Sequence, residues 1–127
     1  MARDGLILSW LQQNTERDEV LWRENELGKV FTVVGSIEIT RASIFQRTGS
    51  LLCFVFTIGS KSTSIVEPQS DGLFKKRYDT EEKQELVTAL YSLSKEISNQ
   101  LERINKFNQE HGQEIKQEIL SKLLSGL

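Results

Sequence analysis

The spacing of hydrophobic residues changes from helical to alternating and back to helical along this chain of 127 residues. Near the start, Leu6, Ile7, Trp10 and Leu11 recur at intervals of three and four positions, which predicts a short amphipathic helix over residues 4–13. One face of this helix is apolar, so it needs an apolar partner surface elsewhere in the fold.

Residues 16–27 admit two interpretations. Thr15 is a suitable N-cap and Gly28 a suitable stop, which predicts a second helix between them. Val20 and Trp22 also lie two positions apart, as residues on one face of a strand do. We take the helix as the expectation and keep the strand as the alternative.

From Lys29 onward the hydrophobic period becomes two, which is typical of strands. The face that begins with Phe31 continues through Gly35 to Ile37, which predicts one long strand bent at the glycine. A tight hairpin at Gly35-Ser36 is the alternative.

Two further turns follow, at Gly49 and at Gly59, and they bound a strand at Leu51–Ile58. A polar edge strand comes next and ends at Pro68, which cannot donate a hydrogen bond to a sheet. Because the connections are short, residues 29–68 should form an antiparallel meander of about four strands.

The strand Leu51–Ile58 is apolar on both faces, whereas a one-sided antiparallel sheet alternates apolar and polar residues. We therefore expect cover on both of its faces. A long helix later in the chain should cover one. The N-terminal helix, the last helix or a second copy of the protein should cover the other.

The most regular helical pattern starts at Asp79, a suitable N-cap with Glu82 three positions later. An apolar stripe at intervals of three and four runs along this helix and comprises Leu86, Leu90, Leu93, Ile97, Leu101, Ile104 and Phe107. Gly112 is the predicted stop, and a second helical pattern follows it to the end of the chain.

A helix over residues 79–111 would be roughly 45 Å long, much longer than about four strands are wide. Its last stripe residues, Leu101, Ile104 and Phe107, would then form an exposed apolar patch. We expect this patch to be covered by a folded-back terminal helix, by a second copy, or by both.

Together these patterns predict a single α+β domain. It comprises an N-terminal helical segment (1–28), an antiparallel β-meander of about four strands (29–68), a long C-terminal amphipathic helix (79–111) and a short terminal helix (113–127). Many unrelated small domains share this order of elements, so the order alone does not assign a function.

Composition and charge exclude several classes of protein. Hydrophobic residues make up 38% and charged residues 27% of the chain, and the net charge is −2. These values indicate a globular chain, neither disordered nor a strongly basic nucleic-acid binder. No run approaches the roughly 20 apolar residues of a membrane helix, and one cysteine cannot form an internal disulfide. We therefore expect a cytoplasmic protein.

Cys53 and His111 are the residues that first suggest chemistry. Cys53 lies mid-strand with no activating cation nearby, so we expect a buried and inert thiol. His111 has no second histidine or cysteine near it, and the chain carries no catalytic signature. We expect no enzymatic activity, no metal and no cofactor.

A basic stretch with aromatic neighbours precedes the long helix and comprises Phe74, Lys75, Lys76, Arg77 and Tyr78. Cations beside aromatic rings suit contacts with phosphates and stacking on bases. The competing interpretation is a solvated loop whose rings pack on the sheet, which the net negative charge of the chain favours.

Trp10 and Trp22 also have two interpretations, since a tryptophan either packs in the core or anchors an interface. The candidate partner interface comprises Trp10, Trp22, Leu101, Ile104 and Phe107. We predict a non-enzymatic protein-interaction module, an adaptor, chaperone or regulatory subunit, that forms a homodimer through its long C-terminal helix. A second protein is a further candidate partner, and nucleic-acid binding through residues 74–78 is the alternative function.

Overall fold

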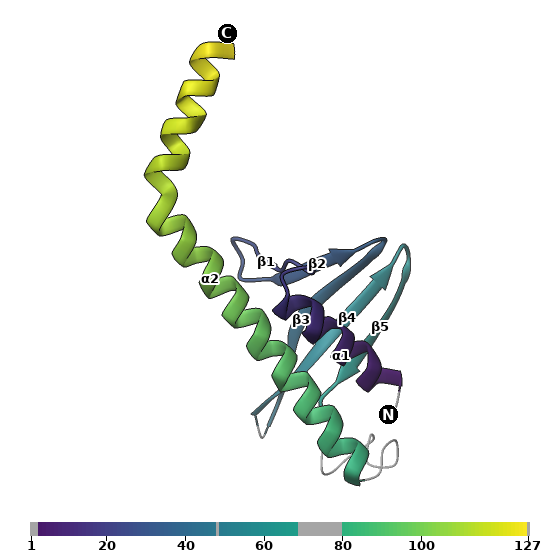
Figure 1. The fold of residues 1–127 in the computed structure, drawn as a ribbon. Helices are drawn as coiled ribbons and strands as arrows, with labels where there is room; N and C mark the ends of the chain where they lie inside the picture. The colour runs from purple at the N-terminus through teal and green to yellow at the C-terminus, as the bar shows by residue number, and fades with distance from the viewer. Residues whose placement is uncertain (1–2, 48, 69–79, 127) are drawn as a thin grey trace.

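The computed structural model describes residues 3–47, 49–68 and 80–126 of the chain. The fold begins with helix α1 (Arg3–Glu16) and ends with a long helix, α2 (Thr80–Gly126), and an antiparallel sheet lies between them in sequence (Figure 1). The strands follow chain order across the sheet and are β1 (Arg23–Glu24), β2 (Val30–Val34), β3 (Ile37–Gln46), β4 (Gly49–Ile58) and β5 (Lys61–Val66). The predicted α+β class and antiparallel meander are therefore confirmed, and the sheet has five strands.

Most of the stretch 16–27 is neither helix nor strand. The backbone carbonyl of Asn14 accepts hydrogen bonds from the N–H groups of Glu19 (2.9 Å) and Val20 (3.1 Å), which closes the end of α1. Asp18 adopts a left-handed φ of 59° and turns the chain there. The predicted helix is therefore wrong, and the alternative strand is limited to the short β1. The turn places Val20 in the core, so tertiary burial prevails over local helix propensity.

Val34 and Ile37 pair directly across a turn at Gly35-Ser36, so β2 and β3 form a tight hairpin. Gly35 has a φ of 61°, the positive value that the first central residue of a type II′ turn requires. The predicted bent strand is wrong, and the alternative hairpin is correct. Val34 and Ile37 pair across the turn, so they lie on the same face of the sheet although they are three positions apart in the sequence. In a single strand, residues three positions apart lie on opposite faces, so simple alternation does not reveal this hairpin.

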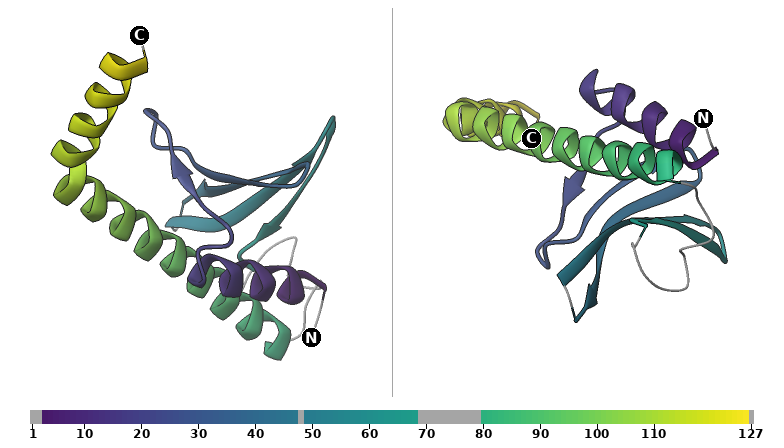
Figure 2. Two further views of the ribbon diagram at one scale, coloured as in Figure 1. Left: turned by 45° about the horizontal axis from the view of Figure 1, so that its top comes forward. Right: turned by 90° about the horizontal axis from the view of Figure 1, so that it is seen from below.

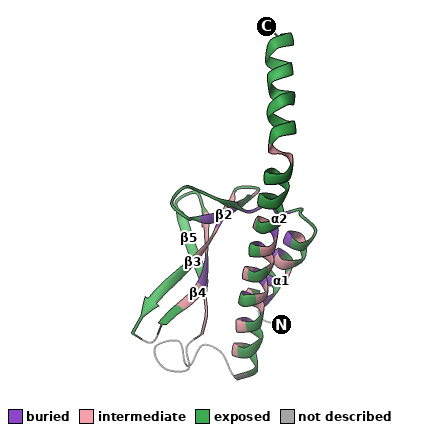
Figure 3. Cartoon of the chain, turned by 90° about the vertical axis from the view of Figure 1, so that its left-hand side faces the viewer, coloured by how far each residue is buried: buried purple, intermediate pink, exposed green. Residues whose placement is uncertain are grey.

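Both helices lie on the same face of the sheet, side by side (Figures 2 and 3). One apolar core fills the space between the helices and the sheet. It comprises Val30, Ile39, Phe54 and Ile65 from the sheet, Leu8, Leu11, Leu86, Leu90, Leu93 and Ile97 from the helices, and Val20 and Trp22 from the coil after α1. The buried side of α1 packs against α2, and this contact keeps the two helices in one layer.

The two apolar faces of β4 have different surroundings. Leu52, Phe54 and Phe56 face the helices and the core. Cys53 and Val55 lie on the opposite face, where Cys53 is only 3% exposed and Val55 is half-buried. No helix of the described ranges covers that face, so the expectation that α1 or the end of α2 lies there is wrong. That a second copy covers the face of Cys53 and Val55 stays a prediction.

α2 is one continuous helix of 47 residues, about 70 Å long. The predicted stop at Gly112 and the separate helix over 113–127 do not form. A glycine inside a helix costs only about 1 kcal/mol relative to alanine, which is too little to end a long helix. The apolar stripe packs on the protein's own core as far as Leu101, and the helix then runs past the sheet and bends near its end (Figure 1). The expected fold-back is therefore absent, and the predicted N-cap, Asp79, lies outside the described residues.

Candidate protein-interaction site

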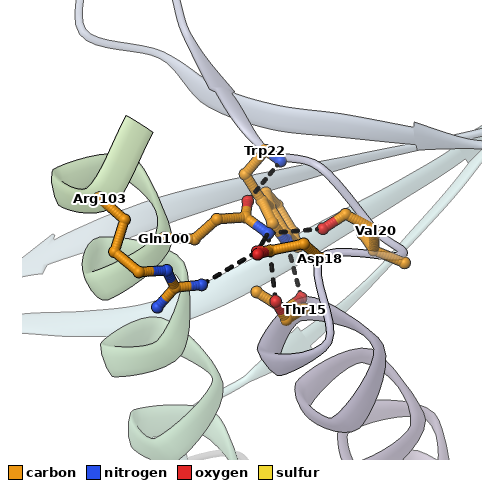
Figure 4. Close-up of polar contacts among 6 residues, drawn as sticks. All are labelled: Thr15, Asp18, Val20, Trp22, Gln100 and Arg103. Carbon is orange, nitrogen blue, oxygen red and sulfur yellow. Dashed lines mark hydrogen bonds and ion pairs between the residues drawn. The ribbon is translucent and has the colours of Figure 1, made fainter. Parts of the chain in front are cut away.

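A buried polar network joins α1 and the coil after it to the middle of α2 (Figure 4). At its centre is Gln100, whose side chain is fully buried. The Gln100 Nε2 group lies within hydrogen-bond distance of the Val20 carbonyl (2.8 Å), the Asp18 Oδ1 atom (3.0 Å) and the Thr15 carbonyl (3.1 Å). The Gln100 Oε1 atom accepts a bond of 2.8 Å from the backbone N–H of Trp22. The network therefore satisfies the polar groups of a chain reversal inside the core.

Trp22 is a core residue and not an interface anchor, since it is 2% exposed and belongs to the core. Its indole Nε1–H donates to the hydroxyl of Thr15 at 2.9 Å. Its ring meets the ring of Phe54 edge to face, with centroids 6.0 Å apart. Both the polar and the apolar parts of this tryptophan are therefore used within one chain.

Asp18 links the network to the surface. Its carboxylate accepts hydrogen bonds from Gln100 and from Arg103 Nη2, the latter at 2.9 Å. The bond from Gln100, and then the bond from Arg103, lower the pKa of the Asp18 carboxyl below its ordinary value. Together with Gln100, this ion pair links the coil after α1 to α2.

With α1 held in this way, a groove of about 480 Å³ remains between α1 and the sheet. Its walls are apolar and comprise Leu6, Ile7, Trp10 and Leu11 from α1 and Val34, Ile37, Ile39, Phe56, Ile58 and Ile65 from the sheet, with Asp4, Thr63 and Ser64 as the polar members. Leu6 is 58% and Trp10 50% exposed. Such a groove suits the apolar face of a helix or another apolar segment.

The second apolar surface lies on the second half of α2, whose first turns pass Glu24 and Arg41 of the sheet before the helix runs past it. Its exposed or partly exposed apolar residues are Ile104, Phe107, Ile115, Ile119, Leu120, Leu123 and Leu124, and we call residues 102–126 the α2 extension. The Phe107 ring lies against the ring of His111, with centroids 4.4 Å apart, and His111 Nδ1 is 3.3 Å from Glu114 Oε2. These contacts are local to the helix and leave the apolar face open.

The five residues named as a partner interface are therefore not one surface. Trp22 is in the core, and Leu101 packs against that core at the edge of the sheet. Ile104 and Phe107 lie on the α2 extension, and Trp10 lines the groove. Sequence reasoning did not find the groove or the role of Gln100. A signal for Gln100 existed, because it is a polar residue on the apolar face of a long helix.

A second hollow, of about 550 Å³, is polar and includes Arg41, Glu24, Glu102 and Lys106. Arg41 Nη1 donates to the Ser94 carbonyl and hydroxyl (both 3.2 Å) and to the Ser98 hydroxyl (3.0 Å). Burial lowers the pKa of Arg41, and the charge of Glu24 opposes this effect. The cations and carboxylates of the hollow balance one another, so it selects neither anions nor cations.

The residues considered for chemistry occupy ordinary positions. Burial raises the pKa of the Cys53 thiol, which disfavours the reactive thiolate. Within residues 3–47, 49–68 and 80–126, no group of three metal-binding side chains comes together. In the same ranges, no helix is long and apolar enough to cross a membrane. The basic stretch Phe74–Tyr78 lies outside the described residues, and nucleic-acid binding through it stays a prediction.

No family model, curated protein or solved structure matches this chain.

Proposed function

We propose that this protein is a non-enzymatic interaction module, an adaptor, chaperone or regulatory subunit, that forms a homodimer through its long C-terminal helix. The observation that carries this proposal is the α2 extension. Its apolar residues continue along the second half of the helix and are all exposed in the protomer.

The hydrophobic effect makes such a surface a candidate interface. Burying one leucine or isoleucine side chain contributes about 1.5–3 kcal/mol, so even partial burial of several on the extension favours association. Contiguous apolar patches of this kind on soluble domains mark interaction sites. A second copy is the simplest partner, since two-fold dimers are the commonest assemblies.

The experiment measures the molar mass of the full chain in solution by light scattering after size-exclusion chromatography. The wild-type protein should have twice the chain mass of 14.6 kDa at micromolar concentration. The double variant Ile104→Lys, Phe107→Lys should have the mass of one chain, because a lysine buried in the interface would lack a partner charge.

The matched control is Asn105→Lys, Gln109→Lys, which adds the same charge to the same turns of α2 outside the apolar face. It should stay dimeric. Both pairs of side chains are exposed in the protomer, so the fold itself should tolerate either change. A wild-type protein that is monomeric at high micromolar concentration would contradict the proposal.

A further inference from the structure

We propose that the groove between α1 and the sheet receives the end of α2 from a second copy, so that two chains exchange their helix ends around a two-fold axis. This inference rests on the homodimer proposed above and names the surface that the partner's helix contacts. It involves two apolar surfaces of the same chain, the groove and residues 115–124 of the α2 extension.

The groove sets the chemistry of its occupant. Of the thirteen described residues that line the groove, ten are apolar, so a bound segment must present apolar side chains along most of its length. Leu6, Trp10 and Ile58 are all at least half exposed at its opening, and a docked helix would remove them from water. Within the part of the lining that the structure describes, the polar residues are Asp4, Thr63 and Ser64 alone, so these walls suit a charged ligand poorly.

The end of α2 has the matching pattern. Ile115, Ile119 and Leu123 are four positions apart and lie along one side of the helix, with Leu120 and Leu124 beside them. All five are exposed in the protomer. Together they form a broad apolar face, and helices dock into grooves through anchors at this spacing.

The same sequence argues against the obvious competitor, a coiled coil between two α2 extensions. A coiled-coil seam needs apolar residues at alternating intervals of three and four. Two such seams start at Ile104. If the first interval is four positions, the seam passes through Asn108, His111, Ile115, Glu118 and Lys122. If the first interval is three positions, it passes through Phe107, His111, Glu114, Glu118 and Ser121. Either of these seams would bury Glu118, whereas docking in the groove also uses Ile119, Leu120, Leu123 and Leu124, which lie off both seams.

The occupant has to come from another chain. α2 is continuous, and it carries its C-terminal end away from the N-terminal half of α1, where the groove begins (Figures 1 and 3). The end of the helix therefore cannot reach the groove of its own chain without breaking. Two-fold exchange also doubles the contact, which matters because stable interfaces bury about 1,600 Å² in total and one groove is small.

The test uses the full chain and two double variants. The groove variant is Leu6→Glu, Trp10→Glu, and the helix-end variant is Ile119→Glu, Leu123→Glu. Each should raise the dimer dissociation constant about 100-fold or more in sedimentation equilibrium, because a docked carboxylate would be buried without a partner. The matched control, Leu27→Glu, Ser121→Glu, changes one exposed position away from the groove and one on the helix end that is not among its five apolar residues, and it should dimerise like the wild type.

Mixing the two variants gives the decisive measurement. The helix-end variant keeps an intact groove, and the groove variant keeps an intact helix end, so the mixture should form a heterodimer through one working contact. Its dissociation constant should be higher than that of the wild-type dimer and lower than that of either variant alone. Neither variant should dimerise alone. An unfolded variant could not restore a dimer in this way, so loss of folding cannot imitate the expected result.

Each other outcome is informative. A groove variant that dimerises like the wild type, beside a monomeric helix-end variant, would overturn the exchange and leave the homodimer standing, as in a coiled coil. The absence of a heterodimer in the mixture would also overturn the exchange. A monomeric wild-type protein would overturn the proposed function and the exchange together, and would leave the groove to a different protein.

Discussion

The side-chain oxygen of Gln100 accepts a hydrogen bond of 2.8 Å from the backbone N–H of Trp22, 78 residues away in the sequence. This bond joins the centre of α2 to the coil that follows α1 (Figure 4). The amide nitrogen of the same side chain contacts three further oxygens, so the one glutamine satisfies donors and acceptors of a buried chain reversal. Gln100 therefore ties the end of α1 and the coil after it to α2, beside the apolar packing of Leu8 and Leu11.

Gln100→Ala should lower the free energy of unfolding by about 2–4 kcal/mol, because it leaves the Trp22 N–H and the Val20 carbonyl without their hydrogen-bond partner. Urea unfolding at a fixed protein concentration measures the change. The matched control is Gln84→Ala, the same substitution at an exposed position of α2, and it should change stability by less than about 0.5 kcal/mol. Equal effects of the two changes would show that the network contributes nothing.

Stability should depend on acidic pH through Asp18. Its carboxyl has a lowered pKa in the folded protein, so it contributes stability above the ordinary aspartate pKa of about 3.9, and this contribution is lost as the pH falls through and below that value. Asp18→Asn should remove this part of the pH dependence, and asparagine also tolerates the left-handed backbone there. Urea unfolding of both proteins between pH 6 and pH 3 measures the difference. Glu19→Gln, the control at the neighbouring residue, should keep the wild-type profile.

Cys53 should react slowly with thiol reagents in the native state and rapidly in urea, since it is buried and burial raises its pKa. The same shift predicts a stability contribution that is complete below the ordinary thiol pKa of about 8.5 and is lost as the pH rises above it. Cys53→Ala should lower stability by about 1 kcal/mol, remove this alkaline dependence and leave dimerisation intact. Native labelling as fast as that of a small free thiol would show that Cys53 is accessible.

Periodic patterns predicted the elements that are long and regular. The stripe from Leu86 to Ile97 packs on the sheet as expected, and the alternation in Leu51–Ile58 marks a real strand. Glycines that need a positive φ also marked real turns, at Gly49 and Gly59. These features depend on interactions between residues that are close in sequence. A pattern over a few helical turns, or over a few alternating positions of a strand, is therefore enough to show them.

The elements that were predicted wrongly depend on distant contacts. Helix and strand were both plausible for residues 16–27, and the outcome followed from burial of Val20 and Trp22 and from the bonds that Gln100 makes to this coil. Gly112 could equally end a helix or lie inside one. Glycine in a helix interior costs only about 1 kcal/mol relative to alanine, so the helical turns on either side keep this residue in the helix.

The candidate site shows the same division. The amino-acid order was sufficient to place apolar residues on the far half of α2, because the spacing of Ile104 and Phe107 follows from helical periodicity. It was not sufficient to show that Leu6 and Trp10 face a groove. That depends on α1 packing beside α2 on one face of the sheet, an arrangement set by contacts between residues about 80 positions apart. Local periodicity carries no information on such pairings, since they are chosen by the burial and hydrogen bonding of the folded chain as a whole.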